Sequence, residues 1–346
     1  MPSLPKPRLR RTSRASALTA PVADPREREP NIQTVEWTSP GGETLRWVNV
    51  EQPTPLECAW LEEQYDFHAL DLEDVLSRNQ RPKIDEYPEY LFIVLHFPVF
   101  DRSVGRLNAG ELDMFVGRDF LVTLPNQPLQ PVEYLFERCR AKDELREQLF
   151  SQGSGYLLYR IVDDSFDYCF PMLRKIGNKL DGLEDEIFEG RGEDVVRDIS
   201  NVKQEIINFR KVIRPQRTVL RDLESAKQPF LAPPDGELEI YFDDIVDSHE
   251  RIWDMLENYK EVVEALEDTN ESLITHRFND VLRILTVFSI VFLPLTLIAS
   301  VWGMNVGLPG GGDPSTSSTT IFWVIIVAMI ALLGGLIAFF RRRGWL

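Results

Sequence analysis

The sequence is poor in the side chains that build soft-metal and redox sites. Its 346 residues include only 3 cysteines and 4 histidines. None of them forms a CxxC, an HExxH or a similar ligand spacing. Isolated cysteines fit a reducing compartment and argue against a metal held by thiolates. Phosphate-binding glycine loops, nucleophile elbows and metal-hydrolase spacings are missing as well, so we expect no enzymatic activity.

Positive charge is also scarce. The chain has 38 Lys and Arg against 55 Asp and Glu, a formal net charge of -17. Binding to nucleic acid requires clustered Lys and Arg, so we expect no nucleic-acid partner. An acidic balance of this size is typical of a protein that attracts cations. The 43% hydrophobic content is enough for a packed core.

Charge is absent from two long runs near the C-terminus. The segments Ile284–Trp302 and Ile321–Phe340, about 19 and about 20 residues long, contain no charged side chain. Each could cross ~30 Å of hydrocarbon as a helix. Two buried core helices are the alternative, but such runs are rare beside a strongly charged body. We predict a first membrane span at 284–303 and a second at 321–340.

The flanking charges predict the topology. Arg277 and Arg283 precede the first span, and a basic segment, 341–346, comes after the second. The predicted outer loop, 304–320, has no Lys or Arg. The positive-inside rule then places both termini in the cytoplasm of a multi-pass protein of the cell inner (plasma) membrane. The N-terminus has no signal-peptide core, which agrees with this.

The first 150 residues divide into a tail and an α/β domain. Residues 1–31 are rich in Pro, Arg and Ser and predict a disordered basic tail, although a transit peptide has similar composition. Residues 32–150 predict a cytosolic α/β domain. Strands are expected at Ile32–Trp37, Leu45–Val50, Tyr90–Phe97, Leu112–Val116 and Phe120–Leu124, and helices at Leu56–Glu63 and Leu70–Leu76.

Helices dominate the chain between this domain and the first span. Residues 151–232 predict a hairpin of two long helices, Tyr156–Glu189 and Asp194–Ala226. The first is acidic toward its end, which indicates either a solvated face or a screen of charge that concentrates cations. Residues 233–283 predict a stalk helix that runs into the first span and is about 90 Å long with it. Its apolar residues recur at intervals of seven: Leu238, Ile245, Ile252, Tyr259, Leu266 and Leu273.

Small polar residues recur along one side of the first span. The spacing of three or four places on one helix face Asn279, Leu282, Leu285, Ser289, Leu293, Thr296 and Ser300. Hydroxyls in a span commonly serve helix packing. The alternative is a pore wall, and because one helix face cannot enclose a pore, that alternative requires several copies of the chain.

The first span ends in Trp302-Gly303-Met304-Asn305, and here the sequence resembles the CorA magnesium-transporter family. That family closes the first of two C-terminal membrane helices with Gly-Met-Asn. The basic C-terminal segment and Phe292–Ala299 are also similar to it. Further resemblances lie at Leu72–Val75, Gln80–Lys83, Tyr156–Tyr159 and Arg210–Pro215. Together they cover about residues 32–346.

The resemblance implies a funnel-shaped homopentamer that conducts Mg2+, with Co2+ and Ni2+ as further cargo. Five copies of Asn305 would bind the water shell of the ion, because Mg2+ gives up its water reluctantly. Met304 would pack, and Gly303 would let the rings approach closely. Along the pore, Asn279 would form a second polar ring, Leu282, Leu285 and Leu293 would form hydrophobic constrictions, and Ser289, Thr296 and Ser300 would line the wetted passage.

The resemblance also implies a regulatory Mg2+ site between neighbouring protomers. Asp244 on the stalk and Asp101 after a strand of the α/β domain match the family pattern best, with Asp243 and Asp247 as helpers. Cytosolic Mg2+ bound there would hold the pore closed. The alternative for an aspartate on an acidic helix is plain solvation.

One departure leaves the ion open. Many relatives continue after the tripeptide with Met-Pro-Glu-Leu, whereas this chain continues with Val306-Gly307-Leu308-Pro309 and keeps one loop carboxylate, Asp313. That loop is more similar to the zinc-transporting ZntB branch, so zinc transport is the alternative. A membrane-anchored scaffold without transport is a second alternative, which the polar face of the first span argues against.

Overall fold

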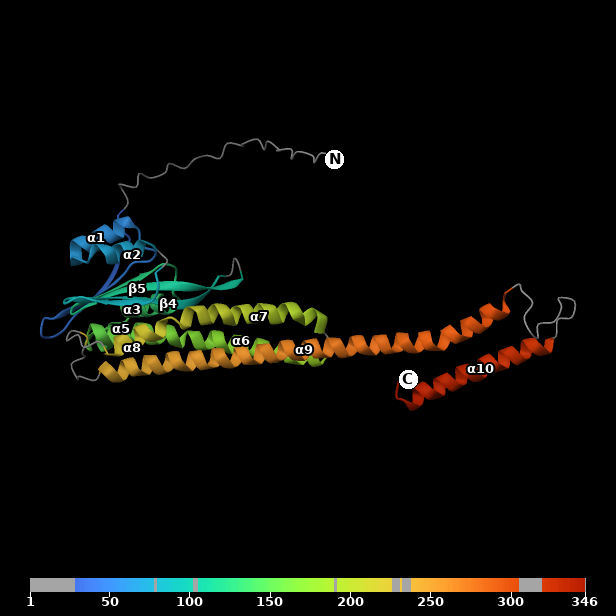
Figure 1. Ribbon diagram of the computed structural model, residues 1–346. Helices are drawn as coiled ribbons and strands as arrows, with labels where there is room; N and C mark the ends of the chain where they lie inside the picture. The colour runs from blue at the N-terminus through green and yellow to red at the C-terminus, as the bar shows by residue number, and fades with distance from the viewer. Residues whose placement is uncertain are drawn as a thin grey trace, which may run out of the picture. The chain divides into compact units, whose positions relative to one another are not determined.

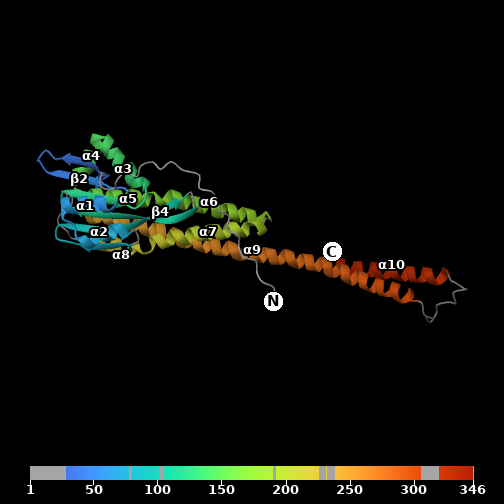
Figure 2. The same ribbon diagram turned by 90° about the horizontal axis from the view of Figure 1, so that it is seen from above.

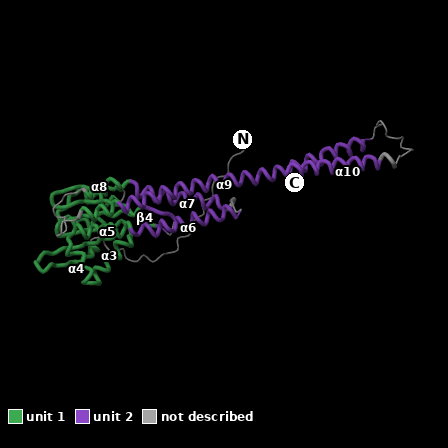
Figure 3. The backbone as a smooth tube through the Cα atoms, turned by 90° about the horizontal axis from the view of Figure 1, so that it is seen from below, with its two compact units in different colours: residues 1–99, 109–166, 215–246 green, residues 100–108, 167–214, 247–346 purple. Residues whose placement is uncertain are grey.

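A computed structural model describes residues 29–77, 80–101, 105–189, 192–225, 231, 238–304 and 319–345 (Figure 1). The predicted tail, up to residue 28, and the outer loop from 305 to 318 therefore lie outside the described residues. The chain forms two compact units (Figure 3). The first holds residues 1–99, 109–166 and 215–246, and the second holds 100–108, 167–214 and 247–346.

The first unit is built on a six-stranded sheet with the order β1-β2-β6-β5-β4-β3. The strands are β1 Gln33–Thr38, β2 Thr44–Asn49, β3 Lys83–Glu86, β4 Tyr90–Asp101, β5 Arg106–Gly117 and β6 Phe120–Pro125. The pairs β1–β2, β3–β4 and β5–β6 are antiparallel, whereas β2 and β6 run parallel. All five predicted strands are present. The short edge strand β3 was not predicted, because its alternating polar residues carry little hydrophobic signal.

The turn between β5 and β6 shows why the sequence needs a glycine there. Val116 pairs with Leu121 across the hairpin. A Cβ atom on Gly117 would lie 2.3 Å from the ring of Phe120. Since no real Cβ approaches an atom so closely, the aromatic ring can fold over the turn only if residue 117 is glycine.

Helices cover both faces of the sheet. On one face lie α1 Pro55–Tyr65 and α2 Ala69–Ser77, as Figure 1 shows. Their buried side chains pack with those of alternate strand residues such as Phe92, Phe115 and Val122. The opposite face packs against further helices, as in the edge-to-face pairs of Trp47 with Phe136 and of Phe97 with Phe166. Those helices are α3 Gln130–Ala141, α4 Asp143–Phe150, α5 Ser154–Asp167 and α8 Gln216–Ser225.

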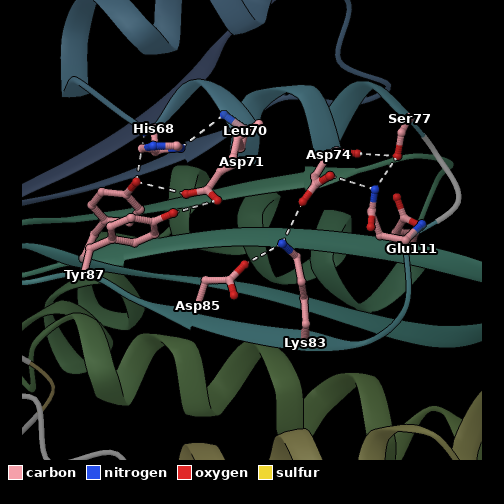
Figure 4. A network of polar contacts seen from close by, with 11 residues as sticks. His68, Leu70, Asp71, Asp74, Ser77, Lys83, Asp85, Tyr87 and Glu111 are labelled. Carbon is pink, nitrogen blue, oxygen red and sulfur yellow. Dashed lines mark hydrogen bonds and ion pairs between the residues drawn. The ribbon is translucent and has the colours of Figure 1, made fainter.

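A polar network fastens α2 to the neighbouring strands (Figure 4). The Lys83 ammonium group donates to Asp74 at 2.7 Å and to Asp85 at 2.5 Å. Burial alone would lower the pKa of Lys83, but these two hydrogen bonds outweigh it and raise the pKa. The amide of Gln80 donates to Asp74 at 2.8 Å. The two segments that resemble the CorA cytosolic domain, 72–75 and 80–83, thus contact each other through Asp74.

The same end of the sheet buries two carboxyl groups of β5. Glu111 is 3% exposed and Asp113 is 1% exposed. The Glu111 carboxylate accepts from the backbone N–H of Gln80 at 3.1 Å and contacts His96 at 3.3 Å. One oxygen of Asp113 has no hydrogen-bond partner among the described residues. Burial, together with the charges of Glu111 and Asp74, raises the pKa of Asp113 well above its ordinary value.

The second unit consists mainly of helices. Two of the predicted long helices need correction, and each has residues in both units. The predicted helix Tyr156–Glu189 is interrupted after Asp167, where α5 ends and α6 Cys169–Phe188 begins. The predicted helix Asp194–Ala226 is interrupted between α7 Gly192–Ile213 and α8. Pro171 is the third residue of α6, shortly after the first break, and Pro215 lies in the second break. Proline has no N–H to donate and its ring clashes with the preceding turn, so a continuous helix is disfavoured at each point.

The stalk and the first span form a single 65-residue helix, α9 Leu238–Trp302. Within the second unit α7 runs antiparallel to it. His249 contacts the Ile213 carbonyl oxygen at 2.9 Å, Arg210 lies 5.0 Å over the ring of Trp253, and Lys203 pairs with Glu267 at 2.5 Å. The predicted apolar stripe provides the packing here, since Ile252 is fully buried and Leu266 is 7% exposed.

The last helix, α10 Thr319–Arg342, packs against the end of α9 (Figure 2). The contact is made by Val287 and Val291 of α9 with Phe340 of α10. Both helices contain segments long and apolar enough to cross a membrane. Most of their apolar side chains are exposed, including Phe288, Leu293 and Trp323. Such exposure fits helices surrounded by lipid.

Candidate functional site

The side chains of the predicted pore face of α9 are exposed along its whole length, because no other described segment of the chain packs on them. All seven of its side chains are exposed or only partly covered: Asn279, Leu282, Leu285, Ser289, Leu293, Thr296 and Ser300. The helix buries a different side against α10, at Val287 and Val291. At about 100° per residue, the predicted face lies roughly opposite that buried side. One chain therefore leaves these residues available to other copies, water or lipid.

Hydroxyl groups on α9 bond to their own helix. Ser289 donates to the Leu285 carbonyl oxygen at 2.9 Å, and Thr296 donates to that of Phe292 at 2.8 Å. Thr286, which the spacing argument omitted, donates to the Leu282 carbonyl oxygen at 2.7 Å. Each hydroxyl proton is thus satisfied without a partner from another helix. The hydroxyl oxygens keep lone pairs that can accept from water, so the face can be wetted.

Proline lies within this part of the helix. Pro294 is an interior residue of α9, and the helix continues past it to Trp302. Because proline has no N–H, the carbonyl oxygen of Ile290 loses its usual helical donor. Ile290 and Pro294 are four residues apart and therefore lie on one side of the helix. This carbonyl group is therefore an additional polar group in the middle of the span.

The helix ends at the predicted filter. The Gly303 N–H donates to the Ala299 carbonyl oxygen at 2.9 Å, and the Met304 N–H donates to the Val301 carbonyl oxygen at 3.4 Å. A Cβ atom on Gly303 would lie 3.0 Å from the Ala299 oxygen, so glycine relieves crowding at the turn. Met304 is 55% exposed. Asn305, the residue expected to bind the hydrated ion, lies outside the described residues.

The predicted regulatory residue Asp244 has a partner that the sequence did not predict. Its carboxylate accepts from the Tyr159 hydroxyl of α5 at 3.2 Å. Burial raises the pKa of Tyr159, and the charges of Asp163 and Asp244 raise it further, so the phenol keeps its proton. The ring packs on Tyr241 with centroids 4.9 Å apart. Tyr159 belongs to a segment that resembles the family, but nothing in that segment indicated its partner.

The other acidic candidates are accessible. Asp243, Asp244 and Asp247 lie on the first turns of α9, and Asp243 and Asp244 are exposed. Asp101 is the last residue of β4 and is half-buried. The pairing of Asp101 with Asp244 of a neighbouring protomer remains a prediction. Within the described ranges, no group of three or more His, Cys, Asp or Glu side chains could hold a metal ion.

The cysteines lie in the interior. All three are buried and none forms a disulfide bond: Cys58, Cys139 and Cys169. Burial raises the pKa of Cys58 and of Cys139 to about 11. They therefore stay protonated at neutral pH and are poor nucleophiles and poor metal ligands.

Known proteins are similar to this chain in both sequence and fold. The chain is 29% identical to the cobalt/magnesium transport protein CorA of Thermotoga maritima over 263 aligned residues. The aligned residues make up 76% of this chain and 73% of that protein. Its fold matches the complete structure of the CorA magnesium transporter from Methanocaldococcus jannaschii with a TM-score of 0.75 at 22% identity, over 87% of this chain and 92% of the other. The cytoplasmic domain of ZntB from Vibrio parahaemolyticus matches with a TM-score of 0.59 at 14% identity, over 70% and 98% of the two chains.

The family model described as "CorA-like Mg2+ transporter protein" matches residues 42–342. This range contains most of the sheet, the long helix α9 and both apolar helices. With a matching sequence over most of its length and two helices suited to a bilayer, the chain is a membrane protein and belongs to the CorA family of divalent cation transporters.

Proposed function

We propose that this protein is a divalent cation channel that carries Mg2+, and with it Co2+ and Ni2+, into the cytoplasm. The observation that supports the proposal most is the bare face of α9, which carries polar and small residues opposite the side that packs on α10. A helix surrounded only by lipid gains nothing from Ser289, Thr296 and Asn279 on one face. Several copies that turn this face inward would enclose a wetted path.

Selection takes place at the outer end of α9. Gly303 and Met304 come directly after the last helical turn. Asn305 is the next residue in the sequence, and in this proposal it would stand at the mouth of the path. An amide oxygen is neutral, and a ring of such oxygens accepts hydrogen bonds from the water shell of Mg2+. This interaction recognises the hydrated ion without holding it too strongly to leave. In a pentamer, the five Asn305 side chains would form this ring.

The apolar members of the face provide the gate. Leu282, Leu285 and Leu293 are exposed in one chain, and in a ring of copies they would narrow the path. A narrow apolar passage expels water, and a hydrated ion cannot pass it. Widening of the ring would rewet the passage. Membrane potential then drives uptake, since two charges gain about 4.6 kcal/mol per 100 mV.

Cytosolic Mg2+ controls the ring through Asp244 and Asp101 of neighbouring copies. Bound Mg2+ would neutralise facing carboxylates and keep the copies in a symmetric, closed arrangement. Loss of the ion would leave like charges opposed and loosen the interface. The hydrogen bond from Tyr159 supports this role, because it fixes the Asp244 side chain in one orientation while leaving the carboxylate exposed.

Both chain termini lie in the cytoplasm in this proposal. Arg283 precedes the first span, Arg341–Arg343 come after the second, and the connecting loop has no basic residue. The acidic sheet unit and the stalk would then face the cytosolic Mg2+ that they are proposed to sense.

Zinc is the second candidate cargo. The loop after Asn305 is more similar to that of the zinc branch, and the cytoplasmic domain of ZntB has the same fold. The complete Gly303-Met304-Asn305 tripeptide favours Mg2+. The scarcity of His and Cys favours it as well, because those residues are the usual ligands of Zn2+.

The test is ion uptake by the full-length protein in liposomes. We expect Mg2+ uptake that Asn305→Ala abolishes and that Asn201→Ala, an exposed asparagine of α7, leaves unchanged. In Asp244→Ala, internal Mg2+ should no longer inhibit uptake, and Tyr159→Phe should raise the internal Mg2+ needed for inhibition. Uptake of Zn2+ alone would assign the protein to the zinc branch, and uptake of neither ion would favour a scaffold.

A further inference from the structure

The C-terminal segment folds back onto α9. Gly344 has a φ of 68°, a conformation that glycine adopts without strain. Its N–H donates to the Arg341 carbonyl oxygen at 3.2 Å, and the N–H of Trp345 donates to that of Phe340 at 3.0 Å. The turn stacks the indole of Trp345 on Phe340, with ring centroids 5.8 Å apart. Since Phe340 is 4% exposed and packs on Val287, the tryptophan is held beside α9.

Arg283 of α9 lies over this tryptophan. The centre of its guanidinium group is 5.6 Å from the Trp345 ring. Its Nε atom is buried and has no hydrogen-bond partner among the described residues. Arg283 directly precedes the uncharged segment of α9, so its charge is held at the edge of the apolar region. A partly desolvated cation with an unused donor favours an anion as neighbour.

Arg283 has further arginines near it and few acidic side chains. Arg341, Arg342 and Arg343 occupy the end of α10 and the turn after it, and all three are exposed. Asp280, one turn before Arg283, is the nearest carboxylate along α9 and is exposed. In the described part of the chain no ion pair joins it to any of these four arginines. The local charge is therefore strongly positive.

We propose that Arg283, Trp345 and the arginines 341–343 form a binding site for the phosphate group of an anionic phospholipid. The guanidinium groups supply charge-assisted donors in the geometry that suits phosphate. The indole places an amphipathic ring at the level where headgroups lie. A membrane lipid is favoured over a soluble phosphate because the arginines lie at the ends of the two apolar segments. This site goes beyond the proposed function and depends on neither the transported ion nor the gate.

The test is lipid binding by the full-length protein in detergent, measured by native mass spectrometry. The probes are dioleoylphosphatidylglycerol and, as the zwitterionic comparison, dioleoylphosphatidylcholine. We expect the anionic lipid to bind more tightly, and Arg283→Gln to weaken it by about fivefold, the effect of one basic residue near an anionic surface. Trp345→Ala should weaken it too, and Arg283→Lys should retain part of the affinity.

Arg251→Gln is the matched control, because Arg251 also lies over an aromatic ring, that of Phe170, at 5.1 Å, but outside the apolar segments. It should leave lipid binding unchanged. Equal binding of the two lipids, or an Arg283→Gln variant that binds the anionic lipid normally, would overturn the proposal. Displacement of the lipid by millimolar inorganic phosphate would assign the site to a soluble anion instead. If Arg283→Gln lost the oligomer but still bound the lipid, the anionic partner of Arg283 would be a carboxylate of a second copy, and the lipid proposal would be overturned.

Discussion

The sheet unit and the pair of apolar helices, α9 and α10, differ in which side chains they bury and in how their polar groups form hydrogen bonds. In the sheet unit, large apolar side chains such as Phe92 and Phe115 are fully buried, and buried polar atoms such as the Trp47 N–H find partners from distant parts of the chain. In the helix pair, α9 and α10, Phe288 and Leu293 are more than half exposed. The hydroxyls of Ser289 and Thr296 donate to carbonyl oxygens of their own helix. The apolar groups of the sheet unit are thus largely buried within one chain, whereas those of the helix pair stay exposed, as suits helices surrounded by lipid.

The largest expected difference concerns phenylalanines. Phe115→Ala should destabilise the sheet unit by about 3–5 kcal/mol, because it opens a cavity beside Phe67 and Phe92. Phe288→Ala should change stability in detergent by less than about 0.5 kcal/mol, because the side chain is exposed. Thermal unfolding followed with a thiol-reactive dye measures both, since all three cysteines are buried. Similar losses in the two variants would mean that the Phe288 face is packed even in detergent.

A second pair compares threonines. Thr123 accepts from the Trp47 indole at 3.0 Å and donates to Asn49 at 2.8 Å. Thr123→Val leaves both groups buried and unpaired, and it should cost about 1–3 kcal/mol. Thr296→Val should cost about 0.6 kcal/mol or less, because its hydroxyl bonds only to the preceding turn. The same unfolding assay applies, and a larger effect at Thr296 would reverse the comparison.

Asp113 allows a prediction on pH. Its pKa is raised in the folded protein, so folding takes up a proton and becomes less favourable as pH rises above the ordinary carboxyl pKa. The loss is on the order of 1 kcal/mol per pH unit until the raised pKa is reached. Asp113→Asn should flatten the fall of the unfolding midpoint as the pH rises above the ordinary carboxyl pKa. The exposed Asp119→Asn is the control, and an unchanged slope in Asp113→Asn would show that Asp113 is ionised in the folded state.

The smallest effect is expected at the surface between α7 and α9. Lys203 pairs with Glu267, but both side chains are about a third exposed or more. Lys203→Ala should therefore lower stability by less than about 1 kcal/mol. The loss should shrink further in high salt, because exposed charges are screened. Unfolding midpoints at low and high salt check this, and a large, salt-independent loss would indicate a role in packing.

Local patterns in the sequence determined much of this protein. The uncharged runs predicted both apolar helices, the sevenfold stripe predicted a continuous α9, and alternation predicted five strands. The polar face of the first span was also visible, because residues three or four apart share a side of any helix. The Gly303-Met304 end was visible in the sequence, and the resemblance of several segments to known members indicated the family. These features depend on neighbours along the chain, so a single sequence is enough to predict them.

Only the tertiary structure decided which elements meet. It placed β2 parallel to β6, added β3 at the edge, and brought Tyr159 to Asp244 and Trp345 to Arg283. It also interrupted the two long helices of the predicted hairpin, one shortly before Pro171 and the other at Pro215, where proline lacks the N–H of a continuous helix. Pairings between residues far apart depend on shape and burial in the folded chain, and no local period encodes them.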